Sequence, residues 1–180
     1  MANPLTQPVT PTTSASTAAG TEPVSEVVIK DPWLAALLGW LIPGAGHLYQ
    51  GRTGKGLLFM VTILGTFFYG LWLGDGKVVY AAFNDSEWRL PYLCQVGVGL
   101  PAMPAMVQAY RVSHGKAPLG RLMVPPAPNT TELSDWQKEL HRYFELGTVY
   151  TMIAGLLNIL VIFDAFGGPP RSVPGPVKKG

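Results

Sequence analysis

A run of small and polar residues at 43–52 is the part of this sequence best suited to chemistry. It reads Pro-Gly-Ala-Gly-His-Leu-Tyr-Gln-Gly-Arg and lies between two apolar segments. Its histidine, His47, has a side chain that gains or loses a proton near neutral pH, so a lipid-acting enzyme with His47 as general base is one hypothesis. The interpretation we favour puts His47 and Tyr49 at the membrane interface, with their polar tips among lipid headgroups or capping carbonyls freed by Pro43.

Known catalytic and nucleotide-binding patterns are missing. Residues 51–56 superficially resemble a phosphate-binding loop, but Tyr49 stands where that pattern needs glycine, and Gly56 stands where it needs serine or threonine. No serine lies in a nucleophile-elbow context, and no two carboxylates are spaced for acid–base catalysis. We therefore predict no catalytic residue, no cofactor and no enzyme activity.

Metal ions and nucleic acids are also poor candidates. Cys94 is the only cysteine, and His114 and His141 lack ligand spacing to each other, so no metal site is predicted. The net charge is +2, and there is no run of lysine and arginine to bind a phosphate backbone. We expect no nucleic-acid partner.

Apolar segments dominate the rest of the chain. Charged residues make up 13% of it, about half the share usual in soluble domains. The apolar residues gather at 33–49, 56–74, 91–110 and 147–166, and about 20 such residues can cross a bilayer. These segments predict an all-α multipass membrane protein with about four membrane-embedded helices. The first, interrupted at 43–46, either spans the bilayer or re-enters it.

Local signals mark where helices begin and meet. Asp31 can cap a helix that has Pro32 in its first position. A capping-box pattern at 134–137 precedes an amphipathic stretch, so we predict an interfacial helix over 134–146. Glycines at 70 and 74 have the small-xxx-small spacing that lets membrane helices approach closely.

The remaining segments are polar. Residues 1–29 are rich in proline, threonine and serine and are predicted to be a disordered tail. A basic Pro/Gly tail at 167–180 is expected to be disordered as well. Residues 76–90 are predicted to form a polar loop, and 111–133 a linker.

Residues 39–75 resemble the two-transmembrane-helix domain family. The matching residues are Gly44, Gly46, His47, Tyr49, Gly51, Arg52, Gly56 and Asp75. The chain departs from the family in having one residue fewer between His47 and Tyr49 and in having Pro43 before the turn. It is also similar to small bacterial multipass proteins of unknown function with a Pro-Gly-x-Gly-His-x-Tyr-x-Gly turn. The resemblance implies a membrane hairpin over 30–75 and no particular reaction.

The same turn has a physical interpretation that does not depend on the family. Pro43 and the glycines allow a sharp change of direction at the membrane edge. Arg52 and Lys55 can then anchor the hairpin among headgroups and contact anionic lipid. We take Pro43, Gly44, Gly46, His47, Tyr49, Gly51, Arg52 and Gly56 as the candidate structural or functional turn.

Charge gives little information about orientation. With four crossings, the lysines and arginines divide seven against six between the two sides, whereas a re-entrant first segment gives eight against five. Both counts are compatible with a cytoplasmic long loop, which we favour. A bacterial cytoplasmic membrane is the expected location.

Function is predicted mainly by exclusion. The leading hypothesis is a non-enzymatic membrane component that packs against a partner or a copy of itself through small-residue helix faces. One alternative is a small transporter or channel component, in which Gln95, Pro101, Pro104 and Gln108 supply polar groups and broken helix geometry along a pathway. The other is the lipid-acting enzyme. Besides the bilayer, the sequence identifies no partner.

Overall fold

The computed structural model describes residues 30–84, 87–88, 90–127 and 131–168. Within these ranges the regular secondary structure is helical, apart from two antiparallel two-residue strands, β1 (Phe83–Asn84) and β2 (Glu87–Trp88), and loops join the elements. The predicted all-α class is confirmed. The predicted amino-terminal tail and nearly all of the carboxy-terminal tail lie outside the described residues.

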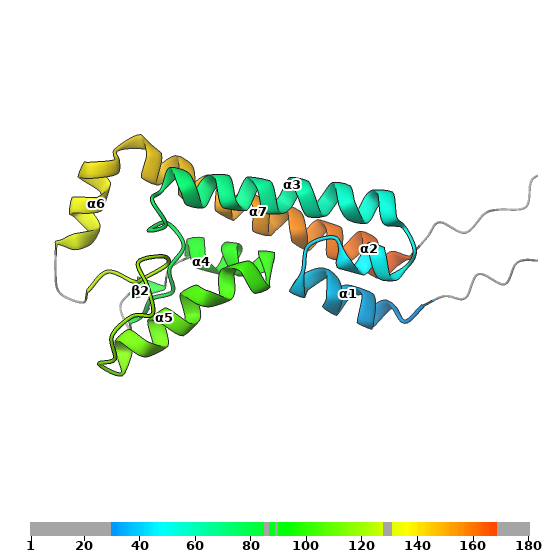
Figure 1. Cartoon of the computed structure of the whole chain (residues 1–180), viewed down its shortest axis with the longest axis horizontal. Helices are drawn as coiled ribbons and strands as arrows, with labels where there is room; N and C mark the ends of the chain where they lie inside the picture. The colour runs from blue at the N-terminus through cyan, green and yellow to red at the C-terminus, as the bar shows by residue number, and fades with distance from the viewer. Residues whose placement is uncertain (1–29, 85–86, 89, 128–130, 169–180) are drawn as a thin grey trace, which may run out of the picture.

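Two long helices run antiparallel along the length of the molecule (Figure 1). They are α3 (Thr53–Leu73) and α7 (Arg142–Gly167), and by length and composition both could cross a membrane. Both match segments predicted from the sequence. They approach closely where Gly70 of α3 faces Gly147 of α7, because neither glycine has a side chain to separate the backbones.

A first hairpin of short helices packs against one end of this pair. Helix α1 (Pro32–Leu41) begins as predicted, with the Asp31 carboxylate accepting a hydrogen bond from the Trp33 N–H at 2.9 Å. The chain then turns at Gly44, and α2 (Ala45–Tyr49) returns toward the end where α1 began (Figure 1). Gly44 has φ +81°, and a Cβ there would overlap the carbonyl oxygen of Gly56. Glycine is therefore required at this turn.

A second hairpin replaces the single continuous helix predicted at 91–110. Helix α4 (Leu90–Gln95) continues into the 3₁₀ turn η1 (Val96–Val98), and after Gly99 the turn η2 (Leu100–Ala102) leads into α5 (Met103–Ser113). Helix α5 runs back to the side of the molecule where α4 begins (Figure 1). The Tyr92 hydroxyl donates to the Ala102 carbonyl at 3.4 Å and links the two arms of the hairpin.

The tips of the two hairpins meet near the middle of the molecule. Gly99 has φ +84°, and a Cβ there would overlap the Trp40 carbonyl oxygen at the end of α1. On α7, the Asn158 amide nitrogen donates to the carbonyls of Gly39, at 3.1 Å, and Gly97, at 2.9 Å. One side chain of a long helix thus binds both short hairpins.

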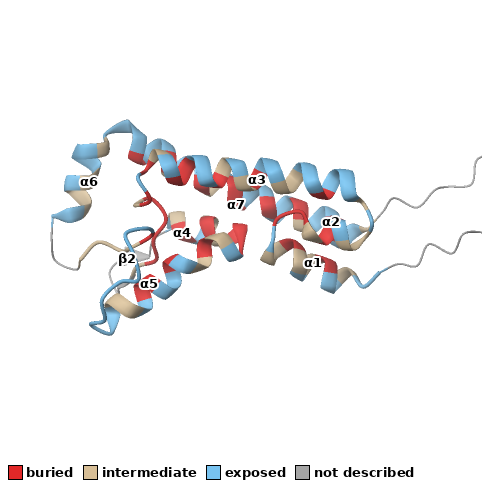
Figure 2. Ribbon diagram, in the orientation of Figure 1, coloured by how far each residue is buried: buried red, intermediate tan, exposed pale blue. Residues whose placement is uncertain are grey.

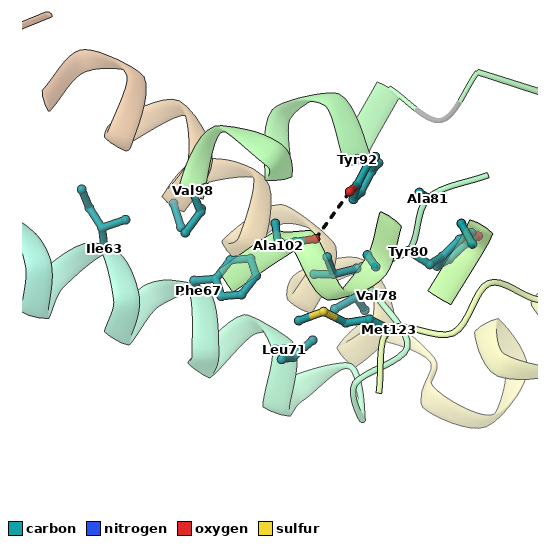
Figure 3. Close-up of a cluster of buried hydrophobic side chains, with 14 of the residues drawn as sticks. Ile63, Phe67, Leu71, Val78, Tyr80, Ala81, Tyr92, Val98, Ala102 and Met123 are labelled. Atoms are coloured by element: carbon teal, nitrogen blue, oxygen red, sulfur yellow. Dashed lines mark hydrogen bonds between the residues drawn. The ribbon is translucent and has the colours of Figure 1, made fainter. Parts of the chain in front are cut away.

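The hydrophobic core extends from the middle of the long helices toward the end where α3 finishes and α7 begins, on the inward faces of the helices (Figure 2). Figure 3 shows Phe67 and Leu71 of α3 beside Val78 and Met123. Residues 78–81 are almost fully buried, so the polar-loop prediction for 76–90 is wrong at this point. The predicted linker also contributes to the core, because Met123 is buried and its N–H donates to Gly76 at 2.8 Å.

The predicted amphipathic helix over 134–146 is divided in the structure. Helix α6 (Glu132–Leu140) has Thr131 as its N-cap, so the capping box predicted at Ser134 is wrong. The Ser134 hydroxyl instead donates to the Thr131 carbonyl at 2.7 Å. A sharp bend at His141, with φ +48°, ends α6, and residues 142–146 belong to α7.

Candidate functional site

A buried histidine paired with an aspartate lies where the first hairpin meets α7. His47, on α2, is fully buried, and its Nε2 lies 2.7 Å from Oδ2 of Asp164. The two residues are 117 positions apart in the chain. With an ionised Asp164, this geometry assigns the Nε2 proton to His47, which donates it to the carboxylate. The ring of Phe59 packs edge-on against the imidazole, with the centroids 5.1 Å apart.

Two further cations reach the same carboxylate oxygen. Arg52 Nη2 lies 3.3 Å from Asp164 Oδ2, and Lys55 Nζ lies 3.9 Å from it. Arg52 precedes α3 and Lys55 is in its first turn, so both lie at the start of α3, beside the last turns of α7. The Lys55 side chain is 55% exposed and that of Arg52 is 16% exposed. The lysine contact is therefore weak, and the histidine contact is the best shielded from water.

Other contacts close the same end of the molecule. The Gln50 amide donates to the Ala165 carbonyl. The Trp33 ring meets the Phe166 ring edge-on, with a centroid distance of 5.0 Å. Lys30 Nζ donates to the Tyr49 carbonyl at 2.6 Å. These contacts join α1, α2 and the end of α7. They hold the candidate turn against a helix that is distant from it in the sequence.

Three enclosed polar atoms at this site lack a hydrogen-bond partner among the described residues. They are His47 Nδ1, Gln50 Oε1 and Arg52 Nη1. If His47 donates through Nε2, its neutral ring leaves Nδ1 as an unsatisfied acceptor, which costs free energy. The site therefore contains polar groups that its protein contacts do not fully satisfy.

The eight residues predicted as the candidate turn have different environments. Pro43, Gly44, Gly46, His47 and Gly56 are buried, Tyr49 and Arg52 are half-buried, and Gly51 is exposed. His47 lies in the protein interior, away from the surface position that we favoured from the sequence. The residue that pairs with His47 across the contact between α2 and α7 is Asp164, which was not among the predicted site residues.

A signal for Asp164 was present in the sequence. It is an acidic residue near the end of an apolar segment, and a charge in that position needs a partner of opposite sign. Residues 47–55 carry a histidine, an arginine and a lysine. Periodicity alone gave no reason to bring the two segments together.

The polar residues proposed to line a transport pathway hold the fold together. Gln95 donates to the Thr151 hydroxyl at 2.8 Å and to the Val78 carbonyl at 3.2 Å. Gln108 accepts from the Leu119 N–H at 2.9 Å and donates to the Leu122 carbonyl at 3.2 Å. Gln108 thus fastens α5 to the loop that follows it.

Chemically, the site can hold two helices together and present positive charge at one end of the bundle. Among the described residues, no three histidine, cysteine, aspartate or glutamate side chains gather in a way that could hold a metal ion. A shallow apolar groove begins at Asp164 and runs between α3 and α7, and His47 is not among the side chains that line it. The imidazole is therefore shielded from a molecule in that groove.

Comparison with known proteins gives one family and one local relative. An uncharacterized protein from Methanocaldococcus jannaschii is 48% identical over 33 residues, which are 18% of this chain and 33% of that protein. The chain thus spans about a third of the length of this relative. No solved structure matches the chain. A family model described as a family of unknown function (DUF6677) matches residues 34–177, most of the chain. The chain therefore belongs to the DUF6677 family.

Proposed function

We propose that this chain is a multipass membrane protein that acts as a non-enzymatic helical scaffold for a partner protein or a second copy. The exposed apolar surface of α3 and α7 carries this proposal. In their most apolar windows, only 28% of α3 and 39% of α7 is buried within the chain. The core helix of a soluble protein would be mostly buried. Such extensive exposed apolar surface needs lipid or another protein to cover it.

Helix length and aromatic residues support the membrane location. The 21 residues of α3 extend about 31 Å, close to the roughly 30 Å of hydrocarbon in a bilayer. Exposed Trp33, in the first turn of α1, meets Phe166 near the end of α7, whereas exposed Tyr69 and Trp72 lie in the last turns of α3, at the opposite end of the antiparallel pair. Aromatic side chains are enriched at the two membrane surfaces. The likeness of residues 39–75 to the two-transmembrane-helix domain also favours this location.

In this proposal α3 and α7 cross the bilayer, and the two short hairpins enter it from opposite sides. A broken backbone is tolerated at membrane depth where protein groups satisfy it. Asn158 supplies such bonds to the carbonyls of Gly39 and Gly97. Under this topology the lysines and arginines of the sequence divide seven against six, with the seven on the side of the long loop at 74–146.

The outer face of α3 is the proposed docking surface. Leu58, Val61, Phe68 and Trp72 are each more than half exposed. Gly65 lies between them, and a Cβ there would meet no atom within 4 Å. The small residues at Gly70 and Gly147 pack against each other within the chain, so the partner face is centred on Gly65 instead.

In-membrane crosslinking tests the scaffold proposal. In a Cys94→Ala background, Val61→Cys should give crosslinked species, either a dimer or an adduct with a co-purifying protein. Phe163→Cys on α7 is the matched control and should give few, because Phe163 is also exposed but lies outside this face. The proposal fails if Val61→Cys stays monomeric in membranes and the wild-type chain purifies alone in mild detergent.

A transport function is the second candidate, because two broken hairpins meet at a polar residue in mid-bundle. Transporters often bind substrate where discontinuous helices meet near the membrane centre. The amide oxygens of Gln95 and Asn158 are buried there without partners among the described residues. Ion flux into liposomes that Asn158→Ala abolishes would favour transport over the scaffold. Flux absent from wild-type liposomes would count against it.

A further inference from the structure

An apolar groove runs along the outside of the molecule between α3 and α7. Its volume is about 290 Å³, near the lower limit of roughly 300 Å³ for pockets that bind small molecules. Asp164 stands at its end, and six other side chains form its walls: Phe59, Thr62 and Ile63 from α3, and Leu157, Leu160 and Val161 from α7.

The groove is oriented as the acyl chain of a lipid would be beside membrane-spanning helices. Its wall residues recur every three or four positions on both helices, so it follows the helix axes. It runs from the middle of the pair toward the end where α3 begins and α7 finishes. If these helices cross the bilayer, an acyl chain would lie parallel to them. A partner helix, about 10 Å across, is too wide for a channel of this volume.

The charges at the end of the groove suit an anionic headgroup. Arg52 and Lys55 lie within 4 Å of Asp164, so two fixed positive charges meet one negative charge when His47 is neutral. Lys55 is more than half exposed and can meet a phosphate directly, whereas the Arg52 side chain is 16% exposed and its Nη1 is enclosed by protein, so Arg52 contributes its charge without a direct contact. The start of α3 has no side-chain cap, so its dipole adds positive potential there.

We infer that this groove binds an anionic phospholipid, with one acyl chain between α3 and α7 and the phosphate at Lys55. The inference rests on the proposed membrane location. The groove supplies contacts for the chain, the Lys55 ammonium donates to the phosphate oxygens, and the nearby charge of Arg52 adds to the attraction. Asp164 pairs with both cations at the end of the groove. Its negative charge offsets part of theirs, so the net positive charge of the site is small.

Thermal unfolding of the full-length purified chain in mixed micelles tests the inference. Phosphatidylglycerol should raise the midpoint more than phosphatidylcholine at equal concentration, and inorganic phosphate should have no effect. Lys55→Gln should weaken phosphatidylglycerol binding about fivefold, the effect of one cation near an anionic surface. Lys116→Gln, which removes an exposed lysine elsewhere, should bind like wild type.

A second pair of variants tests the acyl-chain part. Thr62→Phe should fill the groove and reduce the lipid retained in native mass spectrometry to background. Val149→Phe adds the same ring to an exposed position of α7 outside both the groove wall and the α3 docking surface and should retain wild-type lipid. This readout needs only the folded fraction, so a less stable variant remains informative.

The inference is overturned by any of three results. These are equal stabilisation by both lipids, a full shift from inorganic phosphate alone, and wild-type lipid retention by both Lys55→Gln and Thr62→Phe. Each of these can occur in a chain that still partitions into membranes, so failure here is distinguishable from failure of the membrane location. That location is tested separately by extraction of cell membranes at alkaline pH.

Discussion

At the residue scale, the pairing of His47 with Asp164 joins the first hairpin to the last helix. The imidazole is fully buried, whereas the carboxylate is 45% exposed. The histidine therefore depends on its partner more than the aspartate does, since a buried polar group without a partner is costly. The sequence could identify His47 and its glycine-rich turn. It could not identify Asp164 as the partner, because no local pattern connects residues 117 positions apart.

Removing the Asp164 carboxylate should loosen this end of the bundle. Asp164→Ala is expected to lower the free energy of unfolding by about 2 kcal/mol, because Nε2 of buried His47 loses its acceptor. Asp164→Asn keeps an acceptor oxygen and should lose less. Circular dichroism melts in detergent would measure both. The control is Asp75→Asn, since the Asp75 carboxylate is 63% exposed where it pairs with Lys77 at 3.4 Å, and this change should affect stability little. An Asp164→Ala variant as stable as wild type would contradict this role.

Asn158 makes the equivalent contact in mid-bundle. Asn158→Leu removes two donated hydrogen bonds and leaves the carbonyls of Gly39 and Gly97 without them. We expect a loss of roughly 1–2 kcal/mol, the range for side-chain hydrogen bonds between membrane helices. Leu160→Ile, at a 65% exposed site on the same helix, is the control. Equal melting of the two variants would mean that Asn158 does not secure the hairpin tips.

At the element scale, the long helices were predictable and the breaks in the short ones were not. Segments at 56–74 and 147–166 contain nearly continuous apolar residues, and the structure extends each by a few residues. The segment at 91–110 has similar composition, yet its chain reverses at Gly99. That reversal depends on the Trp40 carbonyl packed against Gly99, a contact between distant segments. Pro101 and Pro104 lie in this segment, and a proline can break a helix, but it does not determine the direction of the chain that follows.

The break at Gly99 can be tested by adding one methyl group. Gly99→Ala combines a strained positive φ with an overlap at the Trp40 carbonyl, so we expect a loss of at least about 2 kcal/mol. Gly51→Ala has φ +81° but no atom within 4 Å and should cost less. Gly65→Ala, in the interior of α3 with open space, should be neutral or stabilising. Chemical unfolding in mild detergent would rank the three, and any other order would contradict this explanation.

At the scale of the whole molecule, the long helices α3 and α7 pack antiparallel, and two short hairpins pack against them from opposite ends. Composition and segment length predicted the helical class and both long helices. They did not predict that residues 78–81 and Met123 form part of the core, because these residues lie in stretches whose overall polarity resembles a loop. Burial of such segments depends on how the helices assemble, which no short window of sequence contains.

We propose that α3 and α7 cross the bilayer and that each short hairpin returns to the side from which it came. Single cysteines in a Cys94→Ala background, labelled in sealed vesicles with a membrane-impermeant maleimide, test it most directly. We predict that Lys30→Cys and Thr53→Cys react from one side and that Asp75→Cys and Ser113→Cys react from the other. Labelling of Lys30→Cys and Thr53→Cys from opposite sides, or of Asp75→Cys and Ser113→Cys from opposite sides, would contradict it.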